Sequence, residues 1–191
     1  MKELKITKRI QESEPKIYPA KAEGYLPLPD YVIPIRRTKI PAVDLLKMDF
    51  PNHDWNISGG WGYTQETAVV IEEDTYMHGL SMEGLFVRYR TYEELIVFQP
   101  DGQKFSGIEW KEGNQSLHEG PDGRKYDRIE YLVTAFTDND WEMLKNDWES
   151  HDAYMEDPEG REAHIRLRRS KQIGFITICW FDVSRFFGKL R

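Results

Sequence analysis

The chain has 191 residues and a mass of 22.6 kDa, which favours a single domain with one core. Aromatic residues make up 13% of it, and their large rings compensate for a hydrophobic fraction of only 39%, so disorder of the whole chain is excluded. Cys179 is the only cysteine, which excludes an internal disulfide and any multi-cysteine metal site. The sequence contains no secretory signal and no apolar run of membrane length, so we expect a soluble, cytoplasmic protein without a membrane partner.

The net charge of −7 is distributed unevenly along the chain. Residues 1–50 carry 10 Lys and Arg against 7 Asp and Glu, residues 51–160 carry 8 against 24, and residues 161–191 carry 8 against 2. Such asymmetry marks either an interaction surface or charges that neutralise one another once the chain folds. An acidic chain repels nucleic acid at long range, so we expect no nucleic-acid partner.

Proline dominates the beginning of the chain, where seven of the ten prolines lie within the first 51 residues. Each proline removes a backbone donor and favours extended geometry before it, which excludes a long helix. The sequence therefore predicts an extended proline-rich N-terminal arm over residues 1–50 and a single α+β domain over residues 51–191. Because residues 25–35 are strongly apolar, we expect the arm to pack on the domain rather than to serve as a proline-rich ligand.

A segment rich in glycine and tryptophan follows the arm. Its glycines allow close approach of a ligand to the backbone, and its rings can stack on a sugar, a base or a side chain of a partner. Its candidate ligand-binding residues are Trp55, Gly59, Gly60, Trp61 and Tyr63. The alternative is that the indole rings fold inward, since large aromatic residues are mostly buried, and the sequence leaves their exposure open.

The middle of the chain contains one ambiguous segment and a repeated turn motif. Residues 81–92 fit helical spacing and also strand alternation, and we favour the helix. Residues 95–98, the turn Pro100-Asp101-Gly102 and residues 104–111 predict a hairpin, and a similar Pro-Asp-Gly unit begins at Pro121. This unit resembles the turn-and-strand element of MORN repeats, but two copies are too few for a repeat array. We interpret the units as successive parts of a β-meander.

The last third of the chain predicts one helix and two strands. Thr137 offers an N-cap, and Trp141, Leu144 and Trp148 form a helical stripe that we expect to face a core. Residues 163–169 alternate in polarity as a strand with one solvated face does, and residues 173–183 are apolar on both faces, as in a central strand. The predicted fold is α+β, with a mostly antiparallel sheet packed by one or two helices.

No pattern of catalytic or metal-ligating residues emerges. Cys179 lies in the middle of an apolar run, which is typical of a packed core cysteine, and the sequence lacks a serine nucleophile elbow. The five histidines form no paired-ligand motif, so we expect neither a metal nor a cofactor. These features favour a non-catalytic protein and leave open whether it has enzymatic activity.

The basic cluster near the C-terminus supplies a second candidate site. On a strand face, Arg166 and Arg168 would lie about 7 Å apart, a spacing suited to an anion or an acidic partner. The acidic middle segment favours a non-catalytic binding or interaction module of inhibitor-like or antitoxin-like type, whose acidic central surface meets a basic protein partner. The sequence also allows a homodimer in which these arginines pair with the acidic segment. The alternative is a small enzyme or carbohydrate-binding protein that uses Trp55–Tyr63 and nearby carboxylates.

Overall fold

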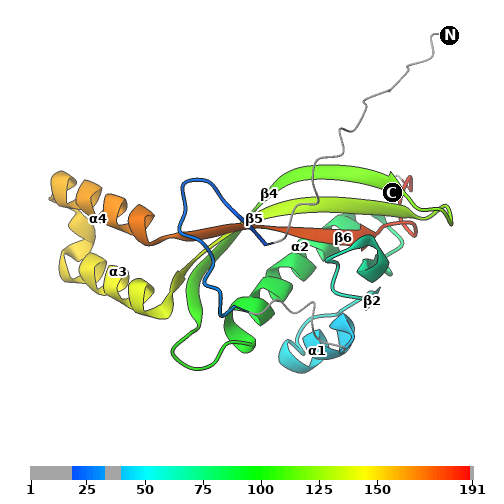
Figure 1. Cartoon of the computed structure of the whole chain (residues 1–191), viewed down its shortest axis with the longest axis horizontal. Coiled ribbons are helices and arrows are strands. Elements are labelled where there is room, and N and C mark those ends of the chain that lie inside the picture. Colours follow the sequence, from blue (N-terminus) through cyan, green and yellow to red (C-terminus); the bar gives the residue numbers. More distant parts are fainter. Residues whose placement is uncertain (1–18, 33–39, 190–191) are drawn as a thin grey trace, which may run out of the picture.

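A computed structural model describes residues 19–32 and 40–189 of the chain, which fold as α+β with a six-stranded sheet and four α-helices (Figure 1). The strands are β1 (Ala20–Lys21), β2 (Ile57–Gly59), β3 (Val69–Ile71), β4 (Phe105–Glu119), β5 (Lys125–Thr137) and β6 (Ile173–Asp182). The helices are α1 (Ala42–Asp49), α2 (Tyr76–Tyr92), α3 (Asp138–Ser150) and α4 (Pro158–Lys171), with shorter turns at η2 (Gln65–Thr67), η3 (Glu93–Val97) and η4 (Asp152–Tyr154).

The sheet is mixed, with the strand order β2-β3-β6-β5-β4 and β1 paired beside β6. The pairs β4–β5, β5–β6, β1–β6 and β2–β3 are antiparallel, whereas β3 pairs with β6 in parallel. The α+β class is thus confirmed, and the expectation of a mostly antiparallel sheet is refined by one parallel pair. That pair arises because α2, β4, β5, α3 and α4 all intervene between its two strands, which provides the long crossover that parallel pairing requires.

Strand β6 is central, as its two apolar faces predict. It lies between β5 on one side and β3 and β1 on the other. Phe181 and Cys179 belong to the main core, and Phe175 belongs to a second buried cluster at the other end of the strand. Burial raises the pKa of the Cys179 thiol to about 12, so this cysteine is a packed core residue as predicted.

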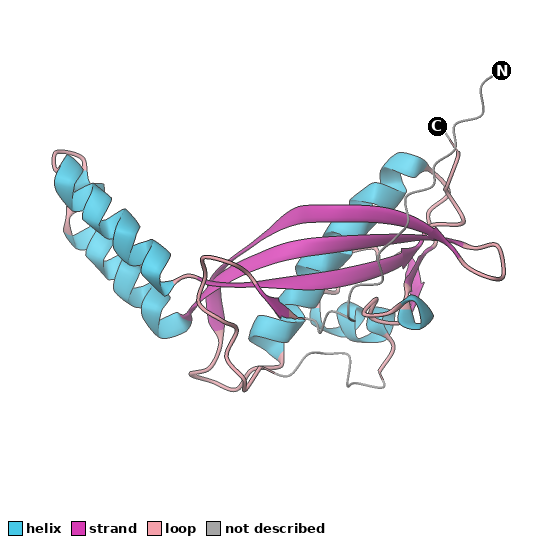
Figure 2. Cartoon of the chain, turned by 45° about the horizontal axis from the view of Figure 1, so that its top comes forward, coloured by secondary structure: helices cyan, strands magenta, loops and turns pink. Residues whose placement is uncertain are grey.

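Helix α2 covers one face of the sheet together with α1, as two views of the molecule show (Figures 1 and 2). The Thr75 side chain caps its first turn by accepting a hydrogen bond from the backbone N–H of His78. Phe86 is fully buried and meets Phe181 edge to face, with ring centroids 5.9 Å apart. The helical interpretation of residues 81–92 is therefore confirmed.

Helices α3 and α4 form a hairpin that is inserted between β5 and β6 and projects beyond the end of the sheet (Figure 2). The predicted N-cap is confirmed, since the Thr137 hydroxyl accepts from the backbone N–H of Asp140. The predicted strand over residues 163–169 is wrong, because this segment lies within α4. Asp157 caps that helix through the N–H of Gly160, and Pro158 occupies its first turn, so residues 157–160 begin a helix.

Three further expectations need correction. The four α-helices of the described residues exceed the expected one or two, chiefly because α4 replaces a strand. Residues 95–98 are not a strand: most of them continue from α2 as the π-helical turn η3, where no glycine or proline interrupts the helix. The turn that joins a hairpin is the second Pro-Asp-Gly unit, at Pro121, which connects β4 to β5.

The N-terminal arm is described only in part. Strand β1 pairs with β6, and Leu28 and Val32 pack on the second buried cluster. Helix α1 begins directly after Pro41, in a region predicted to be extended, since proline is compatible with a helix start. The rest of the predicted arm, residues 1–18 and 33–39, lies outside the described residues. Among the residues that the structure describes, no helix has the length and apolarity needed to cross a bilayer.

Candidate functional site

The two indole rings of the glycine- and tryptophan-rich segment lie in the core. Trp55 and Trp61 are 3% and 4% exposed, and both belong to the main hydrophobic cluster. Their Nε1 atoms donate to the carbonyl oxygens of Phe50 at 3.1 Å and Ile40 at 3.0 Å. Both rings therefore fold inward, which is the alternative that the sequence left open. Each ring is buried, and the Nε1–H of each donates a hydrogen bond within the chain.

The glycines of this segment serve close packing against the chain itself. A Cβ at Gly59 would lie 2.5 Å from the carbonyl oxygen of Ala68, and a Cβ at Gly60 would lie 2.7 Å from that of Thr67. Tyr63 packs beneath the buried Arg90, whose guanidinium carbon is 4.6 Å from the ring centroid. A ligand role for this segment stays a prediction, and it would have to rely on groups other than the two indoles.

Arg166 and Arg168 do not form the strand-face pair expected for them. On α4, residues two apart point in widely different directions around the helix. Arg166 is exposed and lies 3.6 Å from Glu162 on the same helix. Arg168 turns toward the sheet, 3.8 Å from Glu109 and 5.6 Å from the ring centroid of Trp141. A role for either arginine in contact with an anion or a partner stays a prediction, but the strand-face arrangement expected for the two is wrong.

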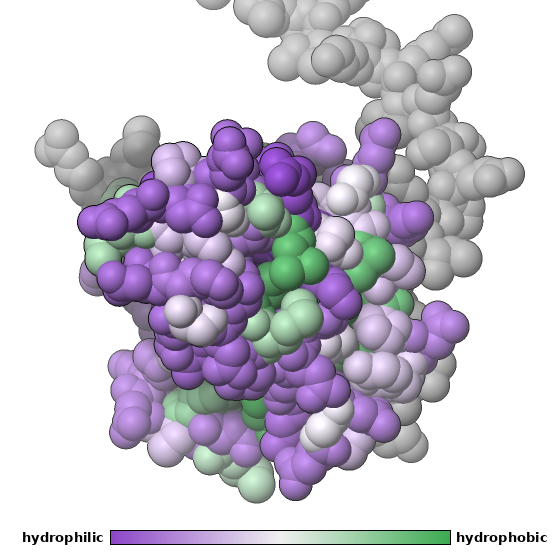
Figure 3. Space-filling view, turned by 90° about the vertical axis from the view of Figure 1, so that its left-hand side faces the viewer, coloured by the Kyte–Doolittle hydropathy of each residue, from purple (hydrophilic) through white to green (hydrophobic). Residues whose placement is uncertain are grey.

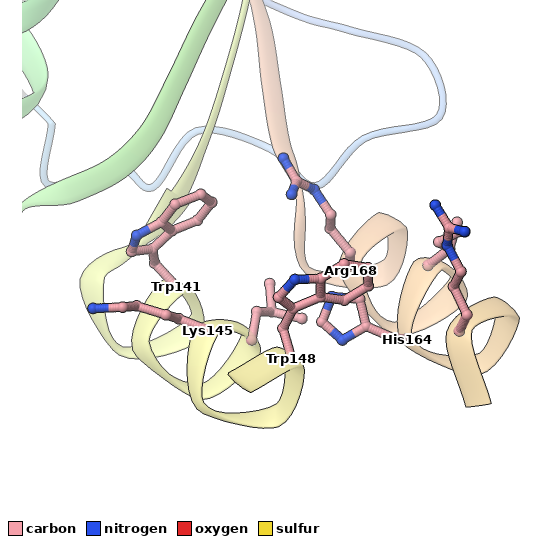
Figure 4. A pocket seen from close by; sticks show the side chains of 8 residues that line it. Trp141, Lys145, Trp148, His164 and Arg168 are labelled. Atoms are coloured by element: carbon pink, nitrogen blue, oxygen red, sulfur yellow. The ribbon is translucent and has the colours of Figure 1, made fainter. Parts of the chain in front are cut away.

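A further candidate site is a groove between α3 and α4. It encloses about 350 Å³, and its walls come from both helices (Figure 4). Its lining residues are Trp141, Leu144, Lys145, Trp148, Arg161, His164, Ile165 and Arg168. Figure 3, which faces the hairpin, shows an apolar patch bordered by hydrophilic atoms. The groove thus combines an aromatic and aliphatic floor with a cationic rim, a composition suited to a partner side chain.

The rim cations are mostly free to meet a partner. Lys145 and Arg161 are exposed and form no ion pair with any residue that the structure describes. Arg168 has an acidic neighbour only at 3.8 Å, in Glu109, whose side chain is 70% exposed. Exposed cations that are not neutralised within the chain create a local positive potential, which attracts acidic groups.

A hydrogen-bonded cluster holds the two helices of the groove together. Asp147 on α3 accepts hydrogen bonds from Tyr154 at 2.9 Å and shares one with Nδ1 of His164 on α4 at 2.7 Å. These two partners lower the pKa of the Asp147 carboxyl. Trp148 packs against the His164 ring, with centroids 4.9 Å apart. The cluster fixes the floor of the groove before any partner arrives.

The turn between these helices is strained. Asp152, Ala153 and Tyr154 all have positive φ values, between 50° and 56°, although none of them is glycine. Such backbone is costly for residues with a Cβ and persists only where surrounding contacts impose it. Here the contacts come from Tyr154, whose ring is buried against His164 and whose hydroxyl reaches Asp147.

Sequence reasoning missed the groove because it missed its second wall. The spacing of Trp141, Leu144 and Trp148 identified an apolar helix face, which we expected to meet the core. Once residues 163–169 were interpreted as a strand, no element remained to pack beside this face. The signal that could have revealed α4 is Asp157-Pro158, a cap residue followed by a first-turn proline.

Among residues 19–32 and 40–189, no group of three or more histidine, cysteine or acidic side chains is arranged to hold a metal ion. Comparison of the chain with protein-family models, with curated proteins and with solved structures finds no match. The function is therefore argued from the geometry of the molecule itself.

Proposed function

We propose that this protein is a non-catalytic interaction module whose α3–α4 hairpin binds an acidic segment of a partner protein. The observation that carries the proposal is the groove itself, with two tryptophans on its floor side and three cations, Lys145, Arg161 and Arg168, among its lining. Tryptophan and arginine are the residue types that contribute most to binding energy at protein interfaces.

The position of the hairpin supports this role. It projects beyond the sheet, so a partner can reach both helices without displacing the core (Figures 1 and 2). The cluster around Asp147 already orders the groove, which reduces the conformational entropy that binding must remove. An exposed and preformed surface is consistent with an inhibitor-like or antitoxin-like interaction module.

The proposed occupant is a peptide segment that presents an aliphatic or aromatic side chain flanked by Asp or Glu. The apolar side chain would pack between Trp148 and Ile165, and its acidic neighbours would lie against Lys145 and Arg161. This assignment differs from the sequence-based expectation of a basic partner for the acidic middle segment. It rests on the charge of the groove rim rather than on the net charge of the chain.

The test uses two labelled peptides with the same leucine and phenylalanine residues, one with glutamates between them and one with lysines. We expect the acidic peptide to raise fluorescence anisotropy and the lysine peptide to bind at least about tenfold more weakly, with affinity falling as salt increases. Lys145→Glu combined with Arg161→Glu should abolish the preference. Arg166→Glu combined with Arg169→Glu, the same charge change on exposed α4 positions outside the groove lining, should change binding less.

Two results would contradict the proposal. Equal binding of both peptides, or of neither, would show that the rim does not select an acidic segment. Sedimentation of the protein as a dimer that Trp148→Ala dissociates would show instead that a second copy of the chain occupies the groove. The variant Trp180→Phe, on β6 outside the groove, controls for loss of a tryptophan elsewhere.

A further inference from the structure

A second hollow lies between α2, the β4–β5 hairpin and the C-terminal residues 183–187. It encloses about 310 Å³, within the range of small-molecule sites. Its lining residues are Tyr76, Leu80, Glu83, Gln115, Ser116, Leu117, Asp127, Val183, Phe186 and Phe187. It shares no lining residue with the groove between α3 and α4.

Two carboxyl groups line this hollow although both are deeply buried. Glu83 is 3% exposed and Asp127 is 7% exposed. Glu83 Oε1 and Asp127 Oδ1 accept no hydrogen bond from any described residue. A buried carboxylate oxygen without a partner costs free energy, so each of these atoms has an unfilled requirement for a donor.

No cation of the described chain meets this requirement. None of its lysines or arginines forms an ion pair with Glu83, Asp127 or the neighbouring Glu112, although many other acids have such partners. Gln115 donates its side-chain amide to Asp127 and so orients that carboxyl from β4. Asp127 is thus oriented by the protein, and neither carboxyl has a cationic partner among the described residues.

The raised pKa of Glu83 is consistent with a carboxyl that lacks a cationic partner. Burial, followed by the nearby charges of Asp127 on β5 and Glu112 on β4, raises the pKa of Glu83 to about 8. Burial likewise raises the pKa of Asp127, with Glu112 adding to the effect and Gln115 and His118 opposing it. Glu83 therefore holds a proton at neutral pH while the hollow is empty, and a bound cation would favour its release.

Three aromatic rings also line the hollow. Tyr76 and Phe187 are 41% and 43% exposed at the hollow, and Phe186 contacts the Tyr76 ring with centroids 6.2 Å apart. Gly79 makes room for Phe186, since a Cβ at this position would lie 2.4 Å from that ring. Aromatic faces attract organic cations, and they also pack against an aliphatic stem.

We propose that this hollow binds an ammonium or guanidinium group on an aliphatic stem, with Glu83 and Asp127 as its acceptors and Tyr76, Phe186 and Phe187 around the stem. The two carboxyls supply acceptors for several N–H donors, which a planar guanidinium or a compact ammonium both provide. The same chemistry occurs in free small amines and in the lysine or arginine side chains of a protein. The site is independent of the groove and does not rest on the proposed function.

The test titrates the full chain by calorimetry with butylammonium and ethylguanidinium as free cations, and with N-acetyl-lysine amide and N-acetyl-arginine amide as side-chain mimics. We expect at least one cation to bind, with an affinity that increases between about pH 6 and about pH 9 because binding favours ionised Glu83. Binding restricted to the free cations would identify a small amine as the ligand. Stronger binding of the capped residues would identify a protein side chain.

Two variants assign the binding to the carboxyl pair. Glu83→Gln and Asp127→Asn keep side-chain size and should each weaken cation binding by about tenfold or more. Glu83→Gln should also remove the increase of affinity with pH, which a purely structural residue would not do. Glu142→Gln removes one exposed carboxyl on α3 and should leave binding unchanged. Thermal melts of each variant confirm that it is folded.

Three outcomes would overturn the proposal. Absence of binding by every cation at about pH 9 would show that the hollow takes no such group. Equal binding of butanol and butylammonium would show an apolar cavity that does not recognise charge. Tight binding of Ca²⁺ or Mg²⁺ that excludes both organic cations would assign the carboxyl pair to a metal instead.

Discussion

The two hollows of this protein hold charge in opposite ways. In the groove between α3 and α4, two of the three cations stand exposed at the rim above an apolar floor. In the hollow beside α2, two carboxyls are buried without a cationic partner among the described residues, and aromatic rings stand at the mouth. Exposed charge costs little and attracts partners from a distance, whereas buried charge is costly and acts only on a ligand that enters.

The hollows also differ in what supports them. Part of the wall of the α2 hollow belongs to the main core, in which Phe186 and Val183 pack with residues of α2. The groove depends on a hairpin that contributes no residue to either buried cluster. One hollow is therefore built partly into the core and the other belongs to a hairpin at the end of the sheet, so we expect that each can be altered without the other.

The largest effect should follow from removal of the hairpin. Strands β5 and β6 are antiparallel neighbours with Ala135 opposite Ile173, so a short turn can replace residues 138–171. We expect the shortened chain to fold, to lose acidic-peptide binding completely and to keep cation binding. Circular dichroism, cooperative urea unfolding and both titrations measure these properties. Loss of cooperative unfolding would show that the hairpin is part of the core after all.

The second effect concerns pH and the α2 hollow. Because the pKa of Glu83 is raised to about 8 in the fold, the folded state holds a proton that the unfolded chain has released above its ordinary value of 4.5. Stability should therefore fall as pH rises between these values, by up to about 1.4 kcal/mol per pH unit from this group. Glu83→Gln removes that contribution. The free energy of unfolding of the variant minus that of the natural chain should therefore increase as pH rises toward 8.

Urea unfolding at several pH values measures this difference. Glu142→Gln, which removes an exposed carboxyl, should show no such trend. A Glu83→Gln variant that follows the natural chain at every pH would mean that Glu83 titrates normally in the fold.

A smaller effect should follow from Asp147→Asn in the hairpin. The change weakens the acceptor of Tyr154 and His164 and should cost about 1–3 kcal/mol of the free energy of unfolding. Since the pKa of Asp147 is lowered in the fold, its contribution is present above the unfolded pKa and is lost as pH falls through the folded value. Hydrogen exchange should show the loss in α3 and α4 and not in β6. Glu149→Gln, an exposed change on α3, is the control.

The smallest effect should follow from Arg168→Gln. Its ion pair with Glu109 is 3.8 Å long and partly exposed, and such pairs contribute less than about 1 kcal/mol to stability. Its role as a groove cation predicts a larger loss of acidic-peptide affinity than of stability. Arg169→Gln provides the matched control on the same helix. A loss of stability well above that of the control would instead make Arg168 a structural residue.

Much of the secondary structure could be predicted because the signals are local. Thr137 and its following acids identify the start of α3, and the double apolar pattern of residues 173–183 identifies β6 as central. The error at residues 163–169 came from an alternation that spans only a few residues, since Ile165 and Leu167 fit a strand while the cap at Asp157 belongs to a helix. The hydrophobic periodicity of so few residues does not distinguish a helix from a strand.

Neither hollow could be predicted, and the reason is the same for both. Glu83 and Asp127 are 44 positions apart in sequence, and they meet because α2 packs across the β4–β5 hairpin. Trp148 and Ile165 meet because a strained turn folds α4 back along α3. Sequence identified the aromatic face of α3 and the abundance of acids, but not which groups face one another.

Length, composition and the uneven charge determined by themselves that this chain folds around a core rich in aromatic rings, and that its charges are either neutralised internally or used for binding. Only the tertiary structure decided which. Several C-terminal cations pair with acids of residues 51–160, among them Lys171 with Asp140 and Arg185 with Glu72, whereas Lys145 and Arg161 form no such pair within the described residues. Charge is additive along a sequence, but pairing depends on distances that packing alone sets.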